Sequence, residues 1–169
     1  MRFQIEQVFA TDPTTLCRAL VDPSYLTQAM GRLPDITAPT IESHRYDPDS
    51  DTVRQALMYS FNGSLPAAVT RIVSPGRLNW IEDTTVDVKA KTAIFRITPV
   101  HYARFFSCQG TWRIVGRPEG CARQLDGNLK VNSPIPFVGG QVEKAIVSGL
   151  RERLEKEPDA FDWWIGRAT

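Results

Sequence analysis

Histidine, cysteine and long apolar runs are scarce in this sequence, and each scarcity excludes a class of protein. The 169 residues include two histidines and three cysteines. Neither His44 nor His101 belongs to an HxH or HxxxH pattern, and no two cysteines form a CxxC pair, so we predict no metal site. The nucleophile motif GxSxG and the phosphate-binding motifs GxGxxG and GxxxxGKS/T are also missing, so we expect no cofactor.

A strong charge of one sign is missing as well. The formal net charge is +1, which gives no reason to expect a nucleic acid or an anionic membrane as partner. No stretch approaches the roughly 18 apolar residues of a membrane span. The N-terminal MRFQIEQVF alternates polar and apolar residues and lacks the continuous apolar core of a signal peptide. We therefore expect a cytoplasmic protein with no integral membrane association.

The three cysteines agree with that location. Cys17, Cys108 and Cys121 are odd in number and widely spaced. This pattern suits reduced, mostly buried thiols better than a disulfide framework.

What is present is a regular order of secondary-structure signals. Residues 2–9 alternate as a strand, although Gln7 falls on the apolar face and makes the alternation imperfect. Asp12-Pro13 and Asp22-Pro23 each place a helix-capping aspartate before a proline at the first helical position. These two pairs predict two short, closely joined helices after the first strand.

From residue 38 onward, apolar residues recur with a period of two, which predicts six further strands. Turn sequences rich in proline, glycine and aspartate separate several of them. The stretch 64–73 is less regular and is compatible with a short helix. The predicted strands cover residues 38–47, 53–61, 77–89, 92–100, 103–116 and 120–133.

The chain ends in helix. The residues after Pro136 predict a long helix that breaks or bends at Pro158, with a final turn or two in DAFDWWIG. We find no repeat, linker or low-complexity segment. The sequence therefore predicts a single domain over residues 1–169, of the α+β class.

Three segments carry a resemblance to a known family: FATDPTTLCRALVDPSYL, CQGTWRIVG and DGNLKVNSPIPFVGGQVEKAIVSGL. With them, nearly the whole chain resembles the START/Bet v 1-like superfamily (SRPBCC, polyketide cyclase-like), and it is most similar to the bacterial family DUF2505. The resemblance implies a helix-grip fold, in which a curved antiparallel sheet of about six to seven strands wraps around the C-terminal helix and leaves a ligand cavity. It says little about activity, because the superfamily includes lipid carriers, receptors and cyclases.

The last helix has an apolar face suited to such a sheet. At about 100° per residue, one side carries Val142, Ala145, Ile146, Gly149, Leu150 and Leu154. Glycine has a low helix propensity, so its presence at position 149 needs a reason. It indicates either close packing of helix on sheet, the interpretation we favour, or room for a ligand. Arg153 and Glu157 interrupt this face, and we expect that end of the helix to project into water.

Aromatic and polar residues of the predicted strands are the candidates for lining the cavity. If Arg123 faces the helix it is a buried cation that needs a carboxylate partner or an anionic ligand group. Pairing with an internal Glu or Asp, or an outer position reached through a bulge, would explain it equally well. The candidate cavity residues are Tyr59, Trp80, Phe95, Phe106, Trp112, Arg123, Leu125, Ile146, Gly149 and Leu150.

Two smaller sets of residues also give expectations. Gly110 and Gly127 lie inside predicted strands and indicate bends or bulges that curve the sheet. Glu82, Asp83 and Asp87 share one strand, and we expect them to be solvated rather than catalytic.

Three functions remain open. The sequence favours a protein that binds a hydrophobic small molecule or lipid, since the candidate residues are mostly apolar with a few polar groups. A cyclase or aromatase-type enzyme acting on a polyketide-like substrate is the second. The third is a closed-cavity protein with a structural or partner-binding role. The scarcity of histidine and of a nucleophile with its base favours binding over catalysis. The oligomeric state has no signal in the sequence.

Overall fold

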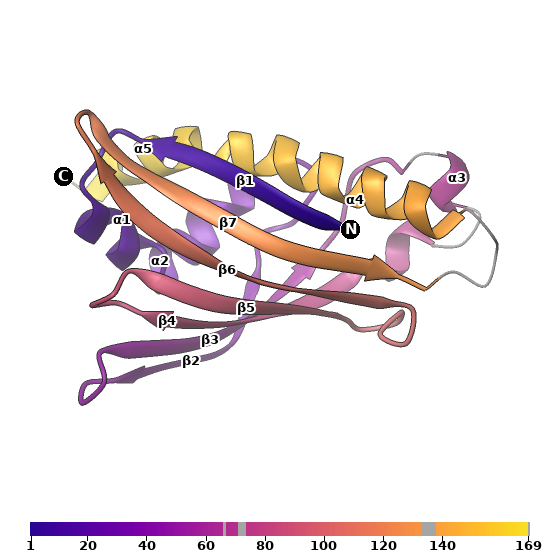
Figure 1. Ribbon diagram of the computed structural model, residues 1–169, viewed down its shortest axis with the longest axis horizontal. Helices are drawn as coiled ribbons and strands as arrows, with labels where there is room; N and C mark the ends of the chain where they lie inside the picture. Colours follow the sequence, from indigo (N-terminus) through magenta and orange to yellow (C-terminus); the bar gives the residue numbers. More distant parts are fainter. Residues whose placement is uncertain (66, 71–73, 133–137, 169) are drawn as a thin grey trace.

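Seven antiparallel strands pair in the order β1-β7-β6-β5-β4-β3-β2 to form one curved sheet (Figure 1). The computed structural model describes residues 1–65, 67–70, 74–132 and 138–168. The strands are β1 (Arg2–Phe9), β2 (Thr40–Asp47), β3 (Thr52–Ser60), β4 (Asn79–Asp87), β5 (Thr92–Pro99), β6 (Phe106–Arg117) and β7 (Gly120–Val131). The helices are α1 (Pro13–Ala19), α2 (Pro23–Gln28), α3 (Ala67–Thr70), α4 (Val138–Glu155) and α5 (Glu157–Ala168), with short 3-10 helices at Met30–Arg32 and Pro75–Arg77.

The period-two pattern predicted every strand, with bounds that differ from the observed ones by at most three residues. The curved sheet with its long C-terminal helix confirms the predicted α+β class. The predicted short helix at 64–73 is present in part as α3, and residues 66 and 71–73 of that stretch lie outside the described residues.

Aspartate side chains cap the N-termini of the two short helices, as predicted. The Asp12 carboxylate accepts hydrogen bonds from the backbone N–H groups of Thr14 and Thr15, at 2.9 and 3.0 Å. The Asp22 carboxylate accepts one from the Ser24 N–H at 2.7 Å. These contacts satisfy N–H groups that the first helical turn leaves without partners.

Helices α4 and α5 lie across one face of the sheet, here called the inner face (Figure 1). Helix α4 packs against β1 and β7, and α5 packs against β1 and α2. Pro158 is the second residue of α5, where a missing N–H costs no hydrogen bond. The final helical segment is therefore longer than the turn or two that we predicted. None of the described helices is long and apolar enough to cross a membrane.

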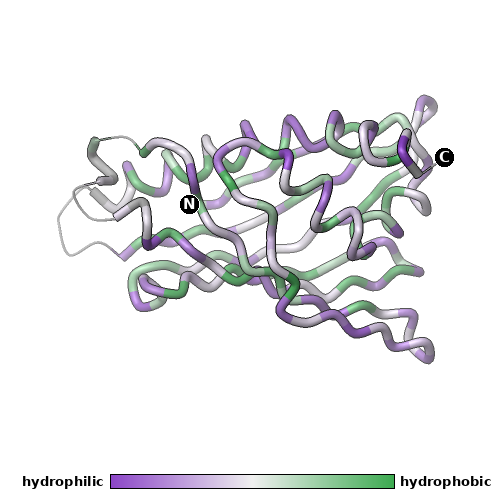
Figure 2. Tube along the Cα trace, turned by 180° about the vertical axis from the view of Figure 1, so that it is seen from behind, coloured by the Kyte–Doolittle hydropathy of each residue, from purple (hydrophilic) through white to green (hydrophobic). Residues whose placement is uncertain are grey.

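The core fills the space between the inner face and the helices. Alternate residues of each central strand are buried, and the turn between β2 and β3 is strongly hydrophilic (Figure 2). Val142, Val147 and Leu154 of α4 and Phe161 of α5 are buried against the sheet. The three cysteines are buried and free, as predicted.

Two glycines stand directly opposite each other in the middle of β6 and β7. Gly110 pairs with Gly127, and the β6–β7 register runs without a shift, so of the predicted bends or bulges a bulge is excluded here. A Cβ on Gly127 would lie 2.3 Å from the Phe3 ring, and one on Gly110 would lie 2.7 Å from the Phe95 ring. The two glycines therefore let the rings of Phe3 and Phe95 lie flat on the sheet, and these rings fill the core beside them.

Candidate functional site

The predicted cavity residues on the strands face inward, but they are buried to different degrees. Tyr59, Phe95, Trp112 and Arg123 are buried in the core. The remaining candidates keep part of their surface accessible although they pack against the core: Trp80, Phe106, Leu125, Ile146 and Leu150. On the inner face of the sheet, the partly accessible candidates are thus Trp80 of β4, Phe106 of β6 and Leu125 of β7.

Arg123 is a buried cation with protein partners. Its side chain is 8% exposed, and it forms an ion pair with the Glu157 carboxylate, which is fully buried. The Arg123 Nε also donates to the Gln7 side-chain oxygen at 2.7 Å. Of the explanations that we left open, pairing with an internal carboxylate is the one observed.

Two further side chains complete this network. The Gln7 amide donates to the Glu157 carboxylate at 2.9 Å, and the Tyr25 hydroxyl donates to the same carboxylate at 3.0 Å. Burial, together with the adjacent carboxylate, raises the pKa of Tyr25 well above its usual value, so its hydroxyl remains a donor. The network of Gln7, Tyr25, Arg123 and Glu157 ties β1, β7, α2 and α5 together and leaves Arg123 no free charge for a ligand.

Our expectation for the end of the C-terminal helix is wrong. Glu157 lies in the core, and Arg153 is half-buried, with its Nε shielded from solvent. Because α5 continues past Pro158 and packs on α2 and β1, this end faces protein rather than water.

Glu82 also differs from the expectation. It projects to the inner face in the cross-strand row Leu57, Glu82, Ile97 and Cys108, whereas Asp83 is exposed on the outer face, as predicted. Burial raises the pKa of the Glu82 carboxyl above its usual value. Among the described residues, the hydrogen bond that it accepts comes from the Thr84 hydroxyl, at 3.4 Å. Glu82 is therefore an internal carboxyl in a mostly apolar environment.

An aromatic stack and a cation lie on the same side of the interior as Glu82. Tyr59 and Trp80 are cross-strand neighbours whose rings stack with centroids 5.6 Å apart and an interplanar angle of 13°. The Arg153 guanidinium carbon lies 5.7 Å from the centroid of the Trp80 ring, within the range of a cation–π interaction. The Arg153 Nε is buried and has no hydrogen-bond partner in the described part of the chain.

Gly149 does not pack closely against the sheet. A Cβ built on it would meet no atom of the described residues within 4 Å, and the residue is partly exposed. The close-packing interpretation that we favoured is therefore wrong at this position. Gly149 precedes Arg153 by four residues, so the two positions share one flank of α4.

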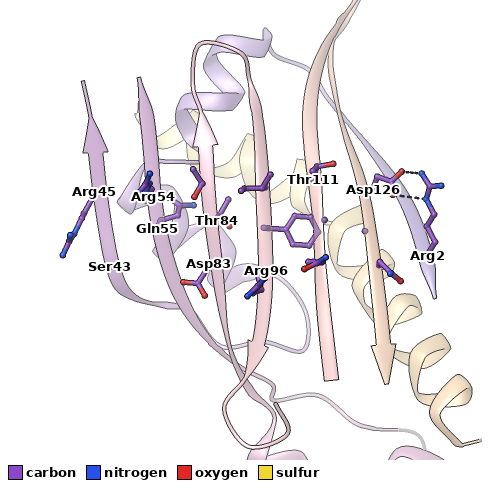
Figure 3. Close-up of a pocket in the computed structure, with 17 residues that line it drawn as sticks. Arg2, Ser43, Arg45, Arg54, Gln55, Asp83, Thr84, Arg96, Thr111 and Asp126 are labelled. Carbon is purple, nitrogen blue, oxygen red and sulfur yellow. Dashed lines mark hydrogen bonds and ion pairs between the residues drawn. The ribbon is translucent and has the colours of Figure 1, made fainter. Parts of the chain in front are cut away.

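A hollow on the opposite, outer face of the sheet has a different character. Arg45, Arg54 and Arg96, on β2, β3 and β5, are among the residues that line it (Figure 3). Its exposed apolar side chain is Ile94, which is 62% exposed. Most of the residues that line this hollow are polar or charged, unlike the mostly apolar lining of sites that bind small molecules. The inner side, around Trp80, Glu82 and Arg153, is therefore the candidate functional site.

The residues that sequence reasoning missed are Glu82, Arg153 and Glu157. Glu82 had a usable signal, because strand alternation places it on the same face as Trp80. The signal for Arg153 and Glu157 was their position on the apolar face of the last helix.

Comparisons with known proteins agree with the fold. The model of a family described as "Protein of unknown function (DUF2505)" matches residues 4–165. No curated protein sequence matches the chain.

Solved structures of similar shape come from several bacteria. The protein TTHA0849 from Thermus thermophilus superposes with a TM-score of 0.66 at 17% identity, over 100% of this chain and 99% of that one. The Zhui aromatase/cyclase from Streptomyces sp. R1128 gives 0.63 at 11% identity, over 95% and 93% of the two chains. Protein Ms6760 from Mycobacterium smegmatis gives 0.57 at 13% identity, over 94% and 88%. At these identities the likeness concerns the fold alone, and it establishes the helix-grip architecture.

Proposed function

The chain belongs to the DUF2505 family of proteins of unknown function, and from that premise we propose that it binds an apolar small molecule or lipid between the inner face of the sheet and α4. The proposed lining combines the predicted residues Trp80, Phe106, Leu125, Ile146 and Leu150 with the open flank at Gly149. We propose the cytoplasm as its location, where its buried free cysteines stay reduced.

The observation that carries this proposal is the incomplete packing of an apolar interior. Inward-facing residues of a filled core are normally fully buried, because protein interiors pack as densely as organic crystals. Here Trp80, Ile146 and Leu150 face inward and remain partly accessible. Together with the space beside Gly149, they supply apolar walls on both the sheet and the helix.

A second function, acid–base catalysis, has one observation in its favour. Glu82 is an internal carboxyl whose pKa burial raises, which is a property of general acids. Some proteins of similar shape are described as aromatase/cyclases. Binding is the better-supported function, because within the described residues Glu82 contacts no second acid–base group by hydrogen bond or ion pair.

Native mass spectrometry and a neutral fluorescent probe test the proposal. The purified protein should carry an extractable apolar molecule or, once stripped, should bind N-phenylnaphthylamine with increased probe fluorescence. Gly149→Leu should abolish this binding, because the new side chain occupies the space beside α4.

Gly140→Leu is the matched control. Gly140 belongs to the same helix, and a Cβ there also meets no atom of the described residues, but the residue is exposed to solvent. This variant should bind the probe as the wild type does. A wild-type protein that is always empty and binds no probe contradicts the proposal. Equal binding by both leucine variants would instead place the bound molecule elsewhere.

A further inference from the structure

Two arginines reach the interior, Arg123 buried and Arg153 half-buried, and within the described residues only Arg123 is neutralised by an ion pair. Arg123 forms its ion pair with Glu157, and Gln7 accepts a further hydrogen bond from it. Arg153 forms no ion pair or hydrogen bond through its side chain within residues 1–65, 67–70, 74–132 and 138–168, and its Nε is shielded from solvent. An arginine keeps its charge even when buried. A guanidinium N–H that is shielded from solvent and has no acceptor is costly, so an acceptor from outside the chain would stabilise Arg153.

The internal carboxyl of Glu82 does not neutralise Arg153 by contact. Glu82 acts on Arg153 through space but makes no ion pair with it. Asp35, the other carboxyl that acts on Arg153, is exposed. Within the described chain, Arg153 is therefore left with its donors unfilled.

The surroundings of Arg153 define the shape of what fits there. The guanidinium lies beside the Trp80 ring, which stacks on Tyr59 and forms a flat apolar wall. Gly149, one helical turn earlier, leaves open space on the same flank of α4. A guanidinium presents parallel N–H donors that match a carboxylate, while the wall and the open flank suit an acyl chain or aromatic body.

Resting on the function proposed above, we infer that the ligand is an amphipathic acid whose carboxylate binds Arg153 and whose apolar body lies against Trp80 and the open flank of α4. The inference assigns to Arg153 the role of binding residue that the sequence had suggested for Arg123. It also narrows the ligand class to acids, because neutral lipids and alcohols carry no negative charge to pair with the guanidinium.

Paired ligands of equal chain length test the inference. Decanoate and decan-1-ol are each used to displace N-phenylnaphthylamine from the wild-type protein and from Arg153→Met. The wild type should prefer decanoate by about tenfold or more, the ratio expected for a hydrogen-bonded ion pair. Arg153→Met should lose that preference and keep its affinity for decan-1-ol. The methionine variant should also fold, because Arg153 has no hydrogen bond to lose within the described chain.

The outcomes separate the inference from the proposed function. If the wild type binds both ligands equally, or if Arg153→Met keeps the preference for decanoate, the inference is overturned and the proposed function stands. If the wild type binds neither the probe nor either ligand, the proposed function fails and the inference fails with it. Arg153→Gln, which is also uncharged, repeats the test should the methionine variant not fold.

Discussion

Arg123 on β7 and Glu157 at the start of α5, which are 34 residues apart in the chain, form an ion pair inside the core. The pair joins the last strand of the sheet to the last helix. Gln7 of the first strand donates to the same carboxylate. A single buried carboxylate thus connects the two ends of the chain.

Glu157→Gln should therefore destabilise the protein strongly. The change keeps the size of the side chain but leaves Arg123 buried without a countercharge, which costs about 3–5 kcal/mol. Urea unfolding of the variant and the wild type measures the loss. Asp126→Asn is the control, because Asp126 pairs with Arg2 at the surface, where solvent screens the pair and the loss should be much smaller. Equal losses of unfolding free energy in the two variants would show that the buried pair stabilises the fold no more than the exposed pair does.

Alanine at two glycines should change stability in opposite directions. Gly149→Ala should stabilise the protein by up to about 1 kcal/mol, because α4 gains helix propensity and the new Cβ meets no described atom. Gly110→Ala should destabilise it by about 1–3 kcal/mol, since its Cβ would lie 2.3 Å from the Asp126 carbonyl oxygen and 2.7 Å from Phe95. Thermal unfolding of both variants checks the signs. A loss of stability in Gly149→Ala would contradict the open space described at that position.

The stability should depend on pH through Glu82. Burial raises the pKa of this carboxyl above its usual value of 4.5, so its protonated form favours the folded state. That contribution is fully present below pH 4.5 and is lost as the pH rises through the folded-state pKa. Glu82→Gln has no such carboxyl. Its free energy of unfolding should therefore increase relative to that of the wild type from acidic to neutral pH. A difference that is constant with pH would mean that Glu82 is exposed to water.

The cysteines should be unreactive in the folded protein. Burial raises the pKa of Cys17 to about 11 and that of Cys108 to about 12, so neither forms the reactive thiolate at neutral pH. Iodoacetamide should leave both unmodified until denaturant is added, as mass spectrometry of the alkylated protein would detect. Rapid alkylation without denaturant would show that the core around α1 or β6 opens.

Local signals predicted most of the fold. The Asp12 and Asp22 caps depend on contacts within three residues, and the strands depend on alternation within about ten, so the sequence itself contains both. The same alternation indicated that the side chains of Trp80 and Arg123 lie on the inner face.

The candidate site was harder to predict, because its chemistry depends on residues that are distant in sequence. The partner of Arg123 became visible only with the direction of α5 after the break at Lys156, because helical phase does not specify a direction across a break in the helix. The empty space at Gly149 depends on how far α4 stands from the sheet, and helix propensity contains no information about that distance. Glu82 was predictable from its neighbour Trp80, but the acidic residues beside it suggested a solvated strand.

The pairing of β1 with β7 has a consequence for synthesis of the chain. Residues 2–9 leave the ribosome well before their hydrogen-bonding partners, which lie at residues 121–128. At a translation rate of about 5–20 residues per second, the first strand waits on the order of ten seconds for its partner. Its apolar residues Phe3, Ile5 and Phe9 remain accessible to chaperones during that time, and a nascent chain that stalls before β7 would expose them to aggregation.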